Sequence, residues 1–244
     1  MREQYKVLKK DGEKVTEDFQ YGHYGFSRKE IVSTILVIII ASFISFFPQI
    51  PDDSIVILSA LIIFSLIIVT TVITKKIAGR VRAIKVEHKI WEFSRYGIYK
   101  RSYLKHPVPV GLIIPFFLSF FTLGYVKPLT FFQFNVENIP EIRLLKARGF
   151  KRALRKEFVH EADPAYAAAW GFYMLGILFC AGYISYKLFD SNFFFDLAKF
   201  SLLYGIWNLL PVSTLDGAKI FFGSFFTWLL LLILYVIFSV IIFI

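Results

Sequence analysis

The chain has 244 residues, 57% of them hydrophobic, and a mean hydropathy of +0.60, which excludes an ordinary water-soluble domain. Lys and Arg outnumber Asp and Glu by 28 to 18, for a net charge of +10. In so apolar a chain this excess indicates membrane orientation rather than nucleic-acid binding. Walker A, GxGxxG and GxSxG motifs are absent from the sequence, which argues against nucleotide-dependent and serine-hydrolase chemistry.

The apolar runs predict an all-α polytopic membrane protein with about five to six transmembrane helices, because crossing a bilayer takes roughly 20 apolar residues. A cytoplasmic N-terminal arm, residues 1–30, precedes a single membrane domain, residues 31–244. The predicted spans of this domain are about 31–47, 54–74, 165–188, 193–210 and 219–244, with a further apolar run at 107–134.

Two basic loops are predicted, at 75–106 and 135–163. The first has ten Lys and Arg against two Glu, and the second has seven against five acids. The loop between the first two spans instead carries Asp52 and Asp53. Because basic loops stay in the cytoplasm, we expect a plasma-membrane protein with a cytoplasmic N-terminus. We also expect the basic loops to contact anionic lipid headgroups.

The apolar run 107–134 contains four prolines and two glycines, and basic loops flank it on both sides. A full crossing would place the seven basic residues of the second loop outside the cell. We therefore predict a re-entrant hairpin, which enters the membrane and returns to the same side, while a full crossing remains the alternative.

The segment 207-WNLLPVSTLDGAKIF-221 breaks the apolar sequence near the C-terminus with Asn208, Pro211, Asp216 and Gly217. A carboxylate at membrane depth is costly and usually marks a functional site. Non-helical backbone at that depth is tolerated only where it is buried in protein or lines a cavity. The segment therefore predicts a polar site, and the alternative is a short loop that joins two spans.

The pattern Asn-x-x-Pro-x-x-x-x-Asp-Gly resembles the third core-helix motif of the site-2 protease family of intramembrane zinc metalloproteases, which perform regulated intramembrane proteolysis. The resemblance implies that Asp216 corresponds to a zinc ligand and that Asn208 helps to hold substrate. The segment 162-ADPAYA-167 is similar to the family's AGPxxN but has Asp163 for Gly and Ala167 for Asn. FSRKE before the first span, and the AIK and EF strings within 83–93, are similar to archaeal members.

The family's catalytic HExxH motif is missing from this chain. At the position set by the AIK string the sequence is 75-KKIAG-79, so Lys75 and Gly79 replace the two histidines and Lys76 replaces the glutamate. Protonated lysines repel Zn²⁺, glycine offers no ligand, and Asp216 alone cannot hold a catalytic zinc. We therefore expect no cofactor, and we expect Lys75, Lys76 and Gly79 to face Asp216.

Two pairs, each of one histidine and one glutamate, are the remaining candidate metal ligands. His160 and Glu161 could join Asp216 in an unusual zinc site, although this segment is also typical of a helix start with Asp163 as N-cap and Pro164 as the first helical residue. The i, i+4 spacing of His88 and Glu92 predicts a solvated helix pair.

These observations favour a site-2-protease-like protein that is catalytically inactive, a pseudoprotease that binds or regulates membrane proteins through their transmembrane segments. One alternative is an active intramembrane metalloprotease with an unusual zinc site. Another is a small channel or transporter in which Asp216 and Asn208 line a polar pathway.

Overall fold

The computed structural model describes residues 25–47, 53–95, 103–138 and 159–243. The N-terminal arm as far as residue 24, Asp52 of the acidic loop, and most of the predicted loop 135–163 lie outside the described residues. The elements are, in chain order, α1 (Arg28–Phe46), α2 (Ser54–Val81), β1 (Ile84–Ile90), β2 (Phe93–Arg95), β3 (Tyr103–Val108), α3 (Val110–Phe121), β4 (Phe132–Asn138), α5 (Ala162–Phe189), α6 (Asn192–Leu209), α7 (Asp216–Gly223) and α8 (Phe225–Phe243).

The fold is that of an all-α polytopic membrane protein with two small β-ladders added. Four helices in the described part of the chain, α1, α2, α5 and α8, are long and apolar enough to cross a membrane. The predicted span 193–210 is α6, which carries Asp196 and Lys199. The predicted span 219–244 is not one helix, because the chain breaks at Ser224 between α7 and α8.

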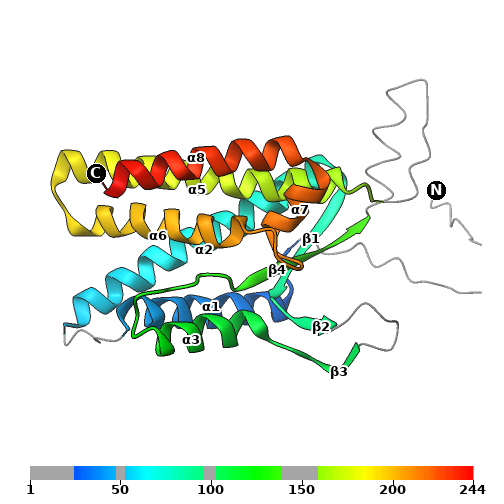
Figure 1. Cartoon of the computed structure of the whole chain (residues 1–244), viewed down its shortest axis with the longest axis horizontal. Coiled ribbons are helices and arrows are strands. Elements are labelled where there is room, and N and C mark those ends of the chain that lie inside the picture. The colour runs from blue at the N-terminus through cyan, green and yellow to red at the C-terminus, as the bar shows by residue number, and fades with distance from the viewer. Residues whose placement is uncertain (1–24, 48–52, 96–102, 139–158, 244) are drawn as a thin grey trace, which may run out of the picture.

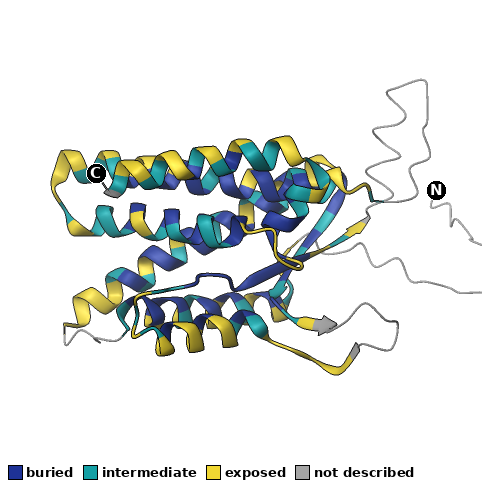
Figure 2. Cartoon of the chain, viewed as in Figure 1, coloured by how far each residue is buried: buried dark blue, intermediate teal, exposed yellow. Residues whose placement is uncertain are grey.

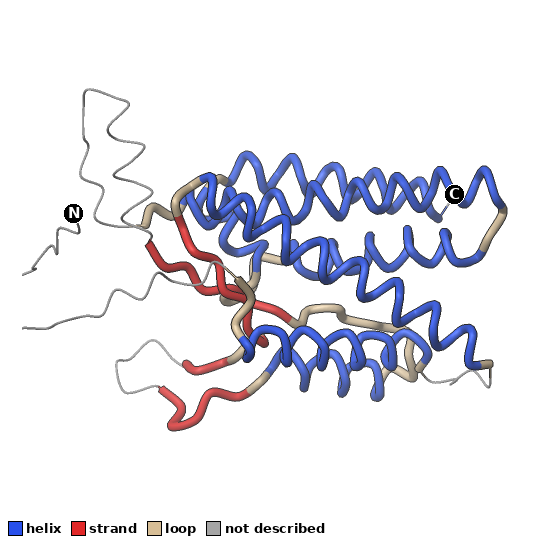
Figure 3. Tube along the Cα trace, turned by 180° about the vertical axis from the view of Figure 1, so that it is seen from behind, coloured by secondary structure: helices blue, strands red, loops and turns tan. Residues whose placement is uncertain are grey.

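The long helices run along one direction in two groups (Figure 1). One group holds α5, α6 and α8, the other holds α1 and α3, and α2 packs against both α1 and α5. The faces of α3 and α8 that point away from the molecule are exposed and apolar, as lipid-facing surfaces are (Figure 2). The four strands gather at one end, which is also clear from behind (Figure 3).

Helix α2 continues to Val81, beyond the predicted end of the span at residue 74. Lys75 and Lys76, expected at the start of a loop, are therefore helical, and Lys75 is only 2% exposed. Both lysines bind buried carboxylates, described below. After it ends, Ala83 adopts a positive φ of 58° and turns the chain into β1.

The apolar run 107–134 leaves the strand end of the molecule and returns to it. Its outgoing limb is α3 and its returning limb is extended. The two limbs meet at Trp91, whose C=O accepts from Gly111 N–H at 2.8 Å and whose N–H donates to Phe131 O at 2.8 Å. A Cβ at residue 111 would overlap the Phe131 carbonyl, so glycine permits this approach. The chain therefore has the predicted hairpin geometry.

Strands β1 and β4 form an antiparallel pair in which Ile84 faces Asn138 and Ile90 faces Phe132. The prediction of a solvated helix at His88 and Glu92 is wrong, because β1 is extended and His88 is 2% exposed. Burial alternates along β1, as expected for a strand that packs one face on a core.

Candidate functional site

Asp216 begins helix α7 immediately after the non-helical segment that follows α6. The chain folds back so closely there that a Cβ on residue 217 would overlap the carbonyl of Leu209, so only glycine fits at this position. Asp216 is 3% exposed, and its Oδ1 has no hydrogen-bond partner among the described residues. The sequence pattern therefore places a carboxylate in the protein interior, as predicted.

The ammonium group of Lys75 forms a buried ion pair with Asp216 Oδ2. Lys75 reaches it across α5, where Gly171 leaves space: a Cβ there would lie 2.5 Å from Lys75 Cε. Lys75 thus faces Asp216, as the register of KKIAG predicts. Lys76 instead points toward α1, and Gly79 packs on β1, where a Cβ would lie 2.6 Å from Val86 Cγ2.

Glu30, in the first turn of α1, is the centre of a second buried cluster. Lys76 Nζ lies 2.6 Å from Glu30 Oε2. The backbone N–H of His88 donates to Glu30 Oε1 at 3.0 Å, and His88 Nδ1 lies 3.2 Å from the same oxygen. We did not single out Glu30 from the sequence. Its position as the last charged residue before the first apolar run was the available signal.

His88 has no such partner on its other ring nitrogen, because Nε2 is buried without a hydrogen bond among the described residues. Burial lowers the pKa of His88 to about 4, although the hydrogen bond with Glu30 acts in the opposite direction. The imidazole is therefore neutral at physiological pH. Protonation would place an additional cation in the protein interior beside Glu30.

The ring of Phe134 on β4 lies between the two clusters. Lys219 Nζ is 3.2 Å from its centroid, Lys75 Nζ is 5.8 Å away, and the His88 ring centroid is 5.8 Å away. Lys219 also donates to the Phe134 carbonyl at 2.5 Å. Lys219 is therefore a member of the site, and it was not predicted because its partner, the Phe134 carbonyl, is distant in sequence.

Asn208, the other polar residue of the motif, binds the returning limb of the hairpin. Its amide donates to Leu129 O at 2.9 Å and to Tyr204 O at 2.8 Å, and the side chain is buried. Thr214, on the loop that follows, hydrogen-bonds to Gln133. Pro211 lies exposed in that loop. The motif therefore contacts the segment 129–134 at several points.

The remaining predicted metal ligands lie elsewhere. His160 and Glu161 are exposed, directly before α5, whereas Asp216 is buried. Helix α5 begins at Ala162, so Asp163 is inside the first turn rather than at the N-cap. Within the described ranges, no three or more His, Cys, Asp or Glu side chains are grouped so that they could hold a metal ion.

Comparison of the chain with protein-family models, with curated proteins and with solved structures gives no match.

Proposed function

We propose that this chain is a site-2-protease-like membrane protein without protease activity, which binds extended segments of membrane-protein partners. The observation that carries the proposal is the buried Lys75–Asp216 ion pair. The pair links Asp216, which by the resemblance would be a zinc ligand, to Lys75, which replaces the first histidine of HExxH. The ammonium group of Lys75 binds the carboxylate that would otherwise be available to coordinate a metal.

Two further features support the loss of a metal site. A catalytic zinc is held by several protein side chains and keeps one position open for water or substrate. Lys75 and Lys219 both act on the charge of Asp216, and in their protonated forms both repel Zn²⁺. At Gly79 even a Cβ would press on Val86, so a histidine ligand would require β1 to move.

The outer edge of β4 is the surface that we propose for partner binding. In an antiparallel pair, directly opposed residues alternate between hydrogen-bonded and non-hydrogen-bonded positions. Trp91 and Phe131 continue the β1–β4 register and are hydrogen-bonded, so the pair of His88 and Phe134 is not. The N–H and C=O groups of Phe134 therefore point away from β1.

Two side-chain contacts agree with this alternation. His88 N–H points outward and donates to Glu30, and the Phe134 carbonyl points outward and accepts from Lys219. By the same alternation the N–H and C=O of Val136 point outward, and neither has a partner among the described residues. An extended segment can add to such an edge through main-chain hydrogen bonds.

The orientation is part of the same proposal. Exposed basic residues, Arg28, Lys29, Arg80 and Arg82, lie at the ends of α1 and α2 near the strands. By the positive-inside rule we place this end, with the β4 edge and the N-terminus, on the cytoplasmic side of the plasma membrane. Anionic lipid headgroups are the expected contacts of these side chains.

Metal content tests the loss of activity. Protein purified in detergent, incubated with zinc and dialysed, should contain far less than one zinc per chain by elemental analysis. One equivalent of zinc that disappears in Asp216→Ala would contradict the proposal and favour the active metalloprotease.

Site-specific photo-crosslinking tests the binding surface. A photoreactive residue at Asn135, whose side chain is exposed on β4 next to the outward main-chain groups of Phe134 and Val136, should capture membrane proteins through a segment adjoining a transmembrane span, with the partner remaining intact. The matched control is Ile233, a half-exposed residue on the lipid-facing side of α8. Equal products from both positions, or capture followed by cleavage of the partner, would be inconsistent with a non-proteolytic binding edge.

A further inference from the structure

The buried site around Phe134 contains more basic than acidic side chains. Lys75 and Lys219 contribute two amino groups, and Asp216 contributes one carboxylate, so one amino group has no acidic partner in the site. Burial lowers the pKa of Lys219 to about 7, although the charge of Asp216 acts in the opposite direction, so this amino group loses its proton readily near neutral pH. The neighbouring cluster is balanced, because Lys76 is paired with Glu30 and the buried imidazole of His88 is neutral. A charge without a partner in the protein interior is costly.

Lys219 is the basic side chain without an acidic partner. Its Nζ donates to a backbone carbonyl and lies over an aromatic ring, both of which are neutral groups. Among the described ion pairs Lys219 has none, while Asp216 is already paired with Lys75. The Phe134 carbonyl that Lys219 holds is also one of the outward groups of the β4 edge. An incoming strand must therefore displace Lys219 before it can complete the ladder.

We propose that the partner segment carries an acidic side chain, Asp or Glu, which pairs with Lys219 when the segment docks on the β4 edge. This inference rests on the proposed function and adds the chemistry of the partner. Docking would exchange a neutral acceptor of Lys219 for a carboxylate and would free the Phe134 carbonyl for a main-chain N–H of the partner. Charge-assisted hydrogen bonds are roughly twice as strong as neutral ones, so the exchange is favourable and keeps the amino group of Lys219 protonated.

The test uses the full chain in nanodiscs of phosphatidylcholine, which supply no anionic lipid. The probes are synthetic single-span peptides whose apolar helix continues into a short β-branched segment with Glu, Gln or Lys at its centre. Binding is measured by fluorescence energy transfer. We expect the Glu peptide to bind about tenfold more tightly than the Gln peptide, as for one added charge-assisted hydrogen bond, and the Lys peptide to bind most weakly.

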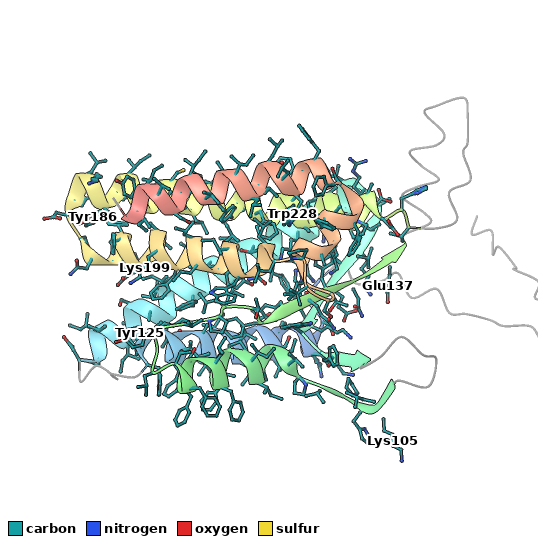
Figure 4. The ribbon with its side chains drawn as sticks, in the orientation of Figure 1. Lys105, Tyr125, Glu137, Tyr186, Lys199 and Trp228 are labelled. Carbon is teal, nitrogen blue, oxygen red and sulfur yellow. The ribbon has the colours of Figure 1, made fainter. Side chains whose placement is uncertain are left out.

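Two variants assign the preference to one residue. Lys219→Gln removes the charge but keeps an N–H donor for the Phe134 carbonyl, so the fold should persist while the Glu preference disappears. Lys105→Gln removes the same charge from an exposed position on β3, at the far tip of the strand end (Figure 4), and should keep the preference. Matching elution profiles and circular dichroism spectra would establish that both variants fold.

The outcomes separate this inference from the proposed function. Equal binding of the Glu and Gln peptides would overturn the acidic partner but leave docking on β4 in place. Binding of none of the peptides would overturn both. If added phosphatidylglycerol abolished the Glu preference as effectively as unlabelled Glu peptide, the anion would be a lipid headgroup, and the inference of an acidic protein segment would be wrong.

Discussion

Lys75 and Lys76 are adjacent in the chain, and their ammonium groups bind carboxylates on different elements. Lys75 binds Asp216 on α7, and Lys76 binds Glu30 on α1. Consecutive helical residues point about 100° apart, so the two lysines leave α2 in different directions. One helical turn of α2 therefore forms ion pairs both with α1 and with α7. Each lysine also supplies the opposite charge that permits a carboxylate to be buried.

The Lys75–Asp216 pair gives a prediction about stability. Removing one partner of a buried ion pair leaves an uncompensated charge and costs about 3–5 kcal/mol, whereas replacing both by apolar residues is often neutral. We expect Lys75→Met and Asp216→Leu each to lower the thermal midpoint strongly in detergent, and the double variant to recover most of the loss. Additive losses in the double variant would mean that the two side chains act independently.

A second prediction at the residue scale concerns the glycines of α5. Gly171→Ala would press a Cβ against Lys75 Cε at 2.5 Å, and we expect a loss of about 1–3 kcal/mol as the lysine is displaced. The matched control is Gly176→Ala, whose Cβ would meet Phe238 at an ordinary 3.4 Å. Its higher helix propensity should make that variant neutral or slightly stabilising. Equal thermal midpoints for the two variants would contradict the role of Gly171.

At the scale of elements, the strands were the main feature that we did not predict. The segment IKVEHKI has many charged residues, and we interpreted it as part of a solvated loop. Its buried positions, Ile84, Val86 and His88, nevertheless follow the period of two that is typical of a half-buried strand. The helical spacing of His88 and Glu92 obscured that alternation. The partner strand β4 lies more than forty residues further on, so no local turn signal marked the pair.

The buried histidine of β1 gives a pH dependence. The pKa of His88 is lowered from 6.5 to about 4 by burial, so the folded chain binds fewer protons than the unfolded chain between these values. Its contribution to stability is complete above about pH 6.5 and is lost as the pH falls toward 4. The full loss is on the order of 3 kcal/mol. Glu30, Lys75 and Asp216 act on this histidine.

The measurement is the thermal midpoint in detergent as a function of pH. The wild-type midpoint should decrease between pH 6.5 and 4 more steeply than that of His88→Gln, which cannot be protonated. His106→Gln, at an exposed position on β3, should follow the wild type. Identical slopes in all three proteins would show that folding does not shift the pKa of His88.

For the molecule as a whole, the features that could be predicted from the sequence were those with a local signal, such as an apolar run, a charge bias or a motif. Apolar run length located the helices, and charge bias located the hairpin, because both depend on local composition. The pairing of Lys75 with Asp216 followed from a motif resemblance. The same register also placed Lys76 and Gly79 toward Asp216, and that part was wrong, because they face α1 and β1. Glu30 and Lys219 were missed because their partners, Lys76 and the Phe134 carbonyl, are distant in sequence and are selected only by packing.

The hairpin geometry makes a prediction about topology that involves the whole chain. Because Gly111 and Phe131 both bind Trp91, the segments before α3 and after the returning limb must lie on the same side of the membrane. Lys105 on β3 and Glu137 on β4 are exposed at this end (Figure 4), whereas Asp53, at the start of α2, lies at the opposite end. In a Cys180→Ser background, which removes the single native cysteine, one cysteine is introduced at each of these positions in turn.

An impermeant maleimide added to intact cells should label the cysteine at position 53 and spare those at positions 105 and 137. In inside-out vesicles the pattern should reverse. Labelling of 105 and 137 from opposite sides would mean that the run 107–134 crosses the membrane. The contacts at Trp91 would then be incompatible with the membrane-inserted protein, and the β1–β4 pair, with its outward edge, could not form as described.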